Sequence, residues 1–84
     1  MIRLEIGPEI SDQMEKDMIL AQDLEEVISN AEETGMKIVD DHNHSFIARK
    51  KIGAVTYWAE YRLTGDAAQI IKAYSHRMSL EMDK

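Results

Sequence analysis

The 84-residue chain contains no cysteine, and this absence excludes several kinds of chemistry at once. Disulfide bonds, thiolate-ligated iron–sulfur clusters, zinc–cysteine sites and thiolate nucleophiles all need cysteine sulfur. A domain this small without cross-links must be held together by packing, and it gains stability if it self-associates. We therefore expect a homo-oligomer, formed as a dimer at micromolar concentration through a sheet face or an edge strand.

Long apolar runs and targeting patterns are absent as well. No stretch approaches the roughly 20 apolar residues that cross a bilayer, and the first residues do not follow the pattern of a signal peptide. We expect a cytoplasmic location and no membrane contact. The four glycines are scattered along the chain and form no phosphate-binding loop. Nothing else in the sequence specifies a cofactor, so none is expected.

What is present is an ordinary globular composition, with 44% hydrophobic and 31% charged residues. It predicts one domain spanning residues 1–84. The net charge of −6 is unevenly divided, because residues 1–41 carry 12 acidic and 3 basic side chains whereas residues 42–84 carry 4 acidic and 7 basic ones. A basic patch in the second half would suit nucleic acid, through Arg49, Lys50, Lys51, Arg62 and Lys72. Because overall acidity opposes phosphate binding, we expect a solvated acidic helix layer instead, and no nucleic-acid partner.

The clearest periodic pattern predicts a helix over residues 24–34. Four apolar residues recur at the spacing of one helix face, and they are Leu24, Val27, Ile28 and Ala31. Asp23 is placed as the N-cap, with Glu26 completing a capping box. Gly35 can adopt the left-handed conformation that ends a helix. Upstream, Gly7 and Pro8 indicate the start of a short helix to about Asp17. We prefer a break before the second helix to one continuous rod over residues 8–34.

From residue 36 onward the apolar period changes from helical to two. The candidate strands cover residues 37–40, 46–50, 54–62 and 69–78, separated by short turns. Consecutive strands joined in this way pair antiparallel. The sequence thus predicts an α+β fold, an antiparallel meander of three to four strands with one or two N-terminal helices packed on one face. Residues 1–6 are read as an edge strand or a loose terminus.

The last hairpin allows a register prediction. If Gly65-Asp66 is a two-residue turn, then Tyr57 lies opposite Tyr74, and Val55 lies opposite His76. Those four residues would share one face of the sheet with Met78.

Trp58 falls on the other face in this register, opposite Ala73 and beside Glu60. An exposed aromatic residue next to charged ones is typical of a contact surface. The alternative is that Trp58 fills the core under the helix stripe, and we prefer this alternative.

The candidate ligand- or partner-binding residues follow from this hairpin, and they are His76, Arg77, Tyr74, Tyr57, Trp58 and Glu60. Consecutive strand residues point to opposite faces, so Ser75 and His76 cannot form a nucleophile–base pair. No catalytic residue is assigned, and an enzyme is the less favoured reading. With Tyr57 and Tyr74 on the same predicted face, His76 could act as a proton donor or bind an anion. A half-buried structural histidine is the preferred interpretation.

Two further histidines, His42 and His44, follow Asp40 and Asp41 at a spacing that could bind one metal ion. The sequence contains no third fixed ligand beside them. A polar turn between two strands explains these residues better, so no metal site is assigned.

Two stretches carry a family resemblance. One runs from Ile19 through Asp23-Leu24-Glu25-Glu26-Val27-Ile28 to Gly35, and the other joins Val55-Thr56-Tyr57-Trp58 with Glu60-Tyr61 to the run Ala73-Tyr74-Ser75-His76-Arg77-Met78. Together they resemble small uncharacterised proteins of anaerobic bacteria, which are often companions of flavin or iron–sulfur oxidoreductases. The resemblance implies an accessory or assembly partner, such as a subunit of an oxidoreductase assembly. It implies no activity and no functional residue.

These observations lead to two functional hypotheses. The first is an accessory or binding module that acts through a sheet face in a protein assembly. The second is a small ligand-binding protein or enzyme with a pocket around His76 and the tyrosines. A flat aromatic face would favour the first hypothesis, and a closed pocket would favour the second.

Overall fold

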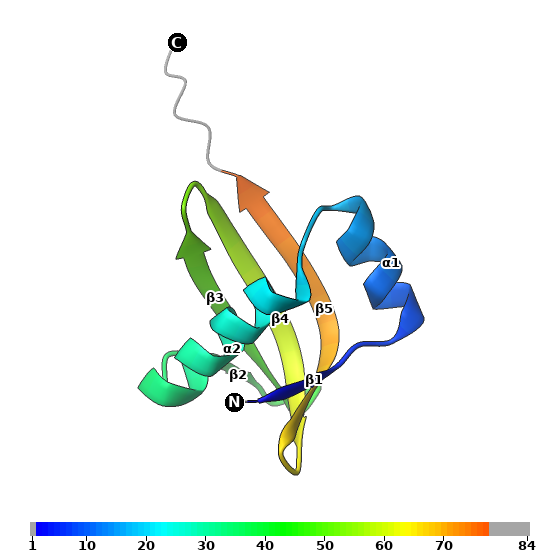
Figure 1. The fold of residues 1–84 in the computed structure, drawn as a ribbon. Coiled ribbons are helices and arrows are strands. Elements are labelled where there is room, and N and C mark those ends of the chain that lie inside the picture. The colour runs from blue at the N-terminus through cyan, green and yellow to red at the C-terminus, as the bar shows by residue number, and fades with distance from the viewer. Residues whose placement is uncertain (1, 78–84) are drawn as a thin grey trace.

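The structure is a computed structural model, and it describes residues 2–77. Its two helices are α1 (Pro8–Lys16) and α2 (Ala21–Thr34). Its strands are β1 (Arg3–Glu5), β2 (Ile38–Asp40), β3 (Ser45–Ile52), β4 (Val55–Thr64) and β5 (Ala67–Arg77). Figure 1 shows the helices lying across a single sheet. The predicted α+β class is confirmed.

The five strands form one mixed sheet in the order β1-β5-β4-β3-β2. Strands β2 to β5 are the predicted antiparallel meander, because short turns join each strand to the next. The prediction of only three or four antiparallel strands is wrong, because β1 adds a fifth strand that pairs parallel to β5. Parallel strands need a long crossover connection. Here the chain runs through both helices and the other strands before it returns beside β1.

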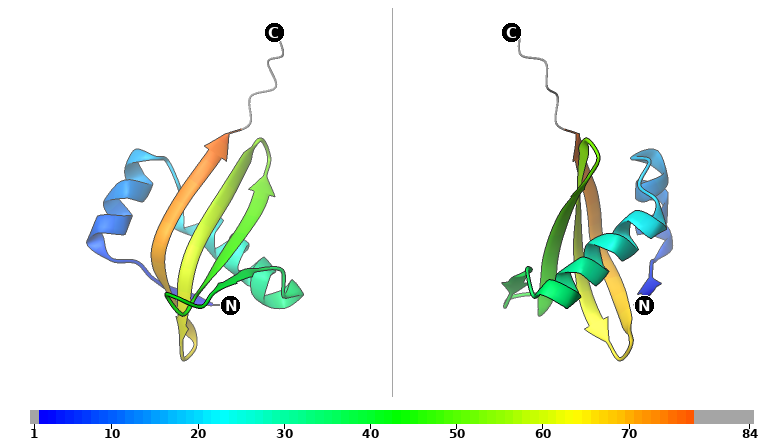
Figure 2. Two further views of the ribbon diagram at one scale, coloured as in Figure 1. Left: turned by 180° about the vertical axis from the view of Figure 1, so that it is seen from behind. Right: turned by 60° about the vertical axis from the view of Figure 1, so that its left-hand side comes forward.

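Both helices pack on the same face of the sheet, as predicted (Figure 2). α2 lies over β3 and β4 and buries its whole apolar stripe, Leu24, Val27, Ile28 and Ala31. The facing strands offer small buried residues, which let the helix approach closely, and these are Ala48 and Ala59. α1 packs against β5 through the buried Met14. Its Gln13 Nε2 donates a hydrogen bond to the Ala73 carbonyl oxygen at 3.2 Å.

The helices are separate, as predicted, and the chain turns sharply between them. Met18 adopts a left-handed conformation there, with a φ of 60°. The predicted N-cap is wrong, because α2 begins three residues earlier and Leu20 is the N-cap. Asp23 lies inside the first turn, where its carboxylate accepts a hydrogen bond from the Leu20 backbone N–H at 3.3 Å. Gly35 ends the helix with a φ of 76°, as expected. Within residues 2–77, neither helix is long and apolar enough to cross a membrane.

A β-bulge in β5 changes the predicted hairpin register. The turn at Gly65-Asp66 is correct, since the residues on either side of it pair, and Tyr61 lies opposite Ile70 as predicted. The next pair is Glu60 with Lys72, so Ile71 is an extra residue without a partner. A bulge shifts every later pair by one position and exchanges the two faces of the strand.

Beyond the bulge, therefore, the predicted pairs are wrong. Trp58 lies opposite Tyr74 instead of Ala73, and Tyr57 lies opposite Ser75 instead of Tyr74. His76 lies opposite Thr56 instead of Val55. Met78 lies outside the described residues. The sheet face turned away from the helices, called the open face below, thus carries Trp58, Tyr74 and His76 together.

Candidate functional site

Three planar side chains form a row across the middle of the open face. Arg49 of β3, Trp58 of β4 and Tyr74 of β5 occupy directly paired positions on neighbouring strands. The rings of Trp58 and Tyr74 are nearly parallel, with centroids 6.0 Å apart and an interplanar angle of 16°. The Arg49 guanidinium lies over the Trp58 ring, 5.4 Å from its centroid. Cation–π and aromatic contacts therefore hold all three groups in one orientation.

Two shallow hollows adjoin this row and share Arg49 and Trp58. The first has a volume of about 500 Å³ and extends over Thr56, Tyr74, Ser75 and His76. The second has a volume of about 490 Å³ and extends towards the end of α2 and the edge strand β2, over Gly35, Met36, Lys37, Ile38 and Ile47. Both are open to solvent, and together they make the open face a broad, gently hollowed surface.

The margin of the second hollow is strongly apolar. Met36 is 75% exposed and Ile38 61%. Neighbouring large apolar side chains held in water mark a candidate contact surface. They extend the aromatic row towards the β2 edge of the sheet, so the apolar surface is continuous from Ile38 to Tyr74.

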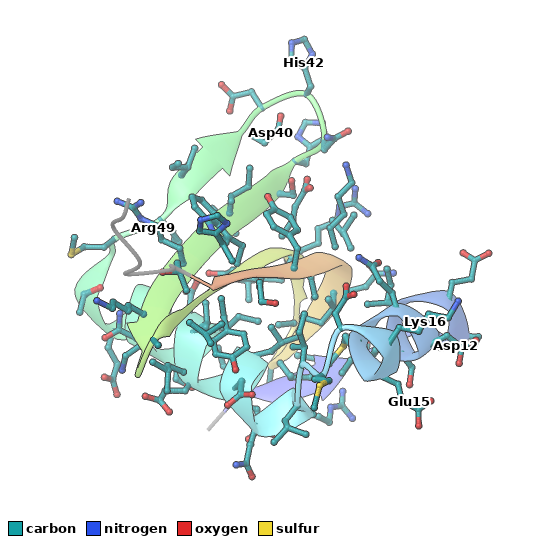
Figure 3. The ribbon with its side chains drawn as sticks, turned by 90° about the horizontal axis from the view of Figure 1, so that it is seen from above. Asp12, Glu15, Lys16, Asp40, His42 and Arg49 are labelled. Carbon is teal, nitrogen blue, oxygen red and sulfur yellow. The ribbon has the colours of Figure 1, made fainter. Side chains whose placement is uncertain are left out.

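Positive charge surrounds the row. Strand alternation and register place Lys51, Lys72 and Arg62 on the open face with Arg49. The strand carboxylates on this face within residues 2–77 are Glu5, Asp40 and Glu60, and each binds a group of the protein itself. Most acidic side chains lie on the helix side instead. Figure 3 shows Asp12 and Glu15 on α1, at the opposite side of the molecule from Arg49.

The loop between β2 and β3 closes one end of the open face. Asp40 accepts hydrogen bonds from the backbone N–H groups of His42 and Asn43, at 3.0 and 3.4 Å. Burial alone would raise the pKa of Asp40, but these hydrogen bonds hold it below its usual value. Arg62 anchors the loop to β4, because its Nε and Nη2 donate to the Asn43 carbonyl oxygen at 3.2 and 2.9 Å.

Under this loop lies a buried polar pair. The Ser45 hydroxyl donates to Glu60 Oε2 at 2.7 Å, and both residues are almost fully buried. Glu60 is therefore held by a hydrogen bond to serine. Glu60 supports the β2–β3 end of the face and is not presented to solvent.

The structure brings half of the predicted site residues together. Trp58, Tyr74 and His76 line one hollow, and His76 is exposed where a half-buried structural histidine was expected. The preferred burial of Trp58 under the helix stripe is also wrong, because Trp58 lies half-buried on the open face. Tyr57 lies on the helix side, packed against the core, and does not join the others. The side chain of Arg77 lies outside the described part of the structure.

Sequence reasoning missed Arg49, Thr56 and the apolar residues Met36 and Ile38 as members of this surface. Arg49 was named only as part of a possible basic patch for nucleic acid. Strand alternation was the available signal, because it places Arg49 and Lys51 on the opposite face from Lys50. Lys50 does point to the helix side, where its Nζ lies 2.9 Å from Glu26 Oε2.

A second polar cluster lies on the helix side and joins α2 to the sheet. Glu32 Oε2 accepts hydrogen bonds from the Tyr61 hydroxyl at 2.5 Å and from Lys37 Nζ at 2.6 Å. Burial would raise the pKa of Glu32, but these two hydrogen bonds and the Lys37 charge lower it. Burial and the same carboxylate raise the pKa of Tyr61 far above its usual value. This cluster is fully used in holding the fold.

Other candidate sites are weaker. A hollow of about 580 Å³ lies where β1 leads into α1, and its charged side chains are Glu5 and Glu9. It contains no cation, histidine or nucleophile. Within residues 2–77, no three histidine or acidic side chains gather closely enough to hold a metal ion, and His42 and His44 lie in the β2–β3 turn.

Comparisons with known protein families, with curated proteins and with solved structures found no match to this chain.

Proposed function

We propose that this protein is a non-catalytic binding module whose open face is the docking surface for an acidic protein partner. The row of Arg49, Trp58 and Tyr74 carries this proposal. Tryptophan, tyrosine and arginine are the residue types that contribute most binding energy at protein interfaces. Their fixed orientation lowers the side-chain entropy that binding would cost.

The charge and the shape of the open face also support a docking surface for an acidic protein. The row has an apolar margin on one side and exposed cations around it, which suits a partner with apolar anchors and carboxylates. The hollows are shallow and open, as a macromolecular contact requires. Nucleic acid is less suitable, because Arg49 and Tyr74 already occupy the two sides of the Trp58 ring where a base would stack.

The sole tryptophan of the chain lies in this surface and reports on its occupancy. The probe is a short synthetic peptide rich in Glu and Asp with a central Leu-Leu pair. A peptide with the same centre and lysines in place of the acids is its control. We expect the acidic peptide to change Trp58 emission, and Arg49→Glu to weaken its binding about tenfold or more.

Arg3→Glu is the matched control variant, because it reverses an exposed arginine on β1, at the far edge of the sheet. Its affinity for the acidic peptide should equal that of the wild type. Equal binding of the acidic and lysine-rich peptides, or an unchanged affinity of Arg49→Glu, would refute the proposal.

A small anionic ligand is the second candidate. The hollow beside the row combines a guanidinium, two hydroxyls and an imidazole, from Arg49, Thr56, Tyr74 and His76. Inorganic phosphate is the probe, followed through Trp58 emission. Because His76 is exposed, His76→Gln should change the free energy of unfolding by less than about 0.5 kcal/mol. It should also weaken phosphate binding at a fixed pH, because the bound anion loses the imidazole contact. An absence of phosphate binding at millimolar concentration would eliminate this candidate.

The cytoplasmic location and the association with an oxidoreductase assembly stay predictions from the sequence. Both are compatible with a docking module, and neither is needed for the proposal.

A further inference from the structure

The surface that complements the open face is present on the same chain. α1 and the connector of residues 17–20 carry four carboxylates, those of Glu9, Asp12, Glu15 and Asp17, beside one cation, Lys16. The connector also exposes two apolar side chains, since Met18 is 83% exposed and Leu20 56%. The helix and connector, called the acidic surface below, thus combine exposed apolar side chains with carboxylates, which is the chemistry that the open face favours.

The backbone conformation between the helices holds the Met18 side chain in solvent. Its φ of 60° is costly for a side chain with a Cβ, and the chain accepts this cost at the point where it turns between the helices. The Met18 N–H donates to the Glu15 carbonyl oxygen, and the Ile19 N–H donates to the Met14 carbonyl oxygen, at 3.2 and 2.8 Å. Ile19 is thereby buried, whereas Met18 and Leu20 on either side of it are held in solvent.

We infer that the open face of one copy binds the acidic surface of a second copy, so that the protein assembles head to tail. This inference rests on the proposed function, because it names the partner of the same face. A two-fold pair of open faces is disfavoured, because it would place Arg49, Lys51 and Lys72 against the same cations. Pairing through the β2 edge alone would join only three residues of strand.

Head-to-tail contact has a consequence for the size of the assembly. The two surfaces belong to opposite faces of the sheet, since α1 packs on the helix side. Different surfaces on opposite sides of a molecule cannot satisfy each other within one two-fold dimer. Each bound pair therefore leaves one free open face and one free acidic surface, and the assembly grows or closes into a ring.

Sedimentation velocity of the wild-type protein from about 10 μM to about 1 mM provides the first test. We expect the mean mass to rise beyond that of a dimer, and to fall again at high salt, where charge attraction is screened. A wild-type protein that stays monomeric over this range, or stops at a dimer, overturns the inference. If the acidic peptide still binds to such a monomer at Trp58, the proposed function stands without it.

The second test uses two variants that each disable one surface. Arg49→Glu disables the open face, and the double variant Glu15→Gln with Asp17→Asn disables the acidic surface without adding positive charge. Each alone should associate about tenfold more weakly than the wild type. Mixed together they should form a heterodimer and nothing larger, because each supplies the intact surface that the other lacks.

Controls make the result specific. Arg3→Glu reverses an exposed charge at the β1 edge of the open face, away from the row of Arg49, Trp58 and Tyr74, and Glu33→Lys reverses one on α2. Both variants should assemble like the wild type. Trp58→Phe is added to the Arg49→Glu variant, so that the mixture contains a single tryptophan. This tryptophan is Trp58 of the other variant, whose intact open face is occupied in the heterodimer, and its emission should shift. Formation of the heterodimer also shows that both variants are folded. If the wild type assembles but the mixture stays monomeric, the contact is not head to tail and the inference is wrong.

Discussion

At the scale of single residues, the contact between Glu32 and Tyr61 links α2 to the middle of the sheet. The Tyr61 side chain is fully buried, so its hydroxyl has no access to water and depends on the carboxylate as its acceptor. Lys37 adds a second hydrogen bond to the same oxygen, and its ammonium also lies 4.0 Å from the centre of the Phe46 ring. One carboxylate therefore satisfies a buried donor and orients the segment that leads into β2.

We predict that Glu32→Ala lowers the free energy of unfolding by about 1–3 kcal/mol at neutral pH, because it leaves the Tyr61 hydroxyl without an acceptor. Glu32→Gln should cost less, since its amide oxygen can still accept. The pKa of Glu32 is lowered in the folded state, so its stabilising effect is present above the unfolded pKa, near about 4.3. That effect is lost as the pH falls through the folded pKa.

Urea unfolding at pH 7 and at about pH 3 measures both effects. The difference between the wild type and Glu32→Gln should shrink in acid. Glu33→Ala, an exposed neighbour, is the control and should be nearly neutral. If the wild type and Glu32→Gln differ by the same free energy of unfolding at both pH values, the charge of the Glu32 carboxylate does not contribute to this contact, and the prediction is wrong.

At the scale of elements, the α2 stripe and the β5 bulge play different parts. The stripe attaches the helix to the sheet, and all four of its side chains are buried. The bulge at Ile71 reorients the second half of β5, so that Tyr74 and His76 turn to the open face and Ser75 turns to the helix side. Without the bulge, Trp58 would face Ala73, and the row with Arg49 and Tyr74 would not exist.

We predict that Ile28→Ala costs about 2–5 kcal/mol of unfolding free energy, through lost burial and the cavity left in the core. Gln22→Ala, an exposed substitution on the same helix, is the control and should change stability by less than about 0.5 kcal/mol. Urea melts of both variants measure the difference. A loss below about 1 kcal/mol for Ile28→Ala would mean that α2 does not dock through this stripe.

At the scale of the whole molecule, charge is divided between two faces. The net charge of −6 hides a carboxylate-rich helix side and an open face on which Arg49, Lys51 and Lys72 are exposed. The net charge therefore does not predict the electrostatic potential at either face, because charge interactions beyond about 10 Å are screened at ordinary salt. The partner responds to the local potential of the face that it approaches.

Collisional quenching of Trp58 tests this division. We predict that iodide quenches Trp58 about twofold or more better than caesium, relative to free tryptophan, although the protein as a whole is acidic. Arg49→Glu should remove or reverse this preference, and high salt should reduce it. A preference for caesium in the wild type would show that the acidic helix side dominates the potential at the open face.

Local patterns predicted the parts of the fold that depend on neighbouring residues. The α2 stripe, the Gly35 helix end, the Pro8 helix start and the Gly65-Asp66 turn are all confirmed, because periodicity and left-handed glycines act within a few residues. The antiparallel order of β2 to β5 followed from the short turns between them. The start of α2 was misplaced because Leu20 has no capping side chain to reveal it.

The sequence alone therefore determined the α+β fold class, the apolar stripe of α2 and the antiparallel meander, because each depends on the spacing of residues along the chain. Only the tertiary structure decided that residues 3–5 are an edge strand and not a loose terminus, because their parallel pairing with β5 bridges more than sixty residues. It also decided which aromatic residues share a face, because one extra residue at Ile71 reverses the alternation on which a register prediction depends. The β5 residues of the candidate binding surface follow Ile71 in the chain. The sequence therefore indicated Trp58, Tyr74 and His76 as candidates, but it did not predict that they share one face with Arg49.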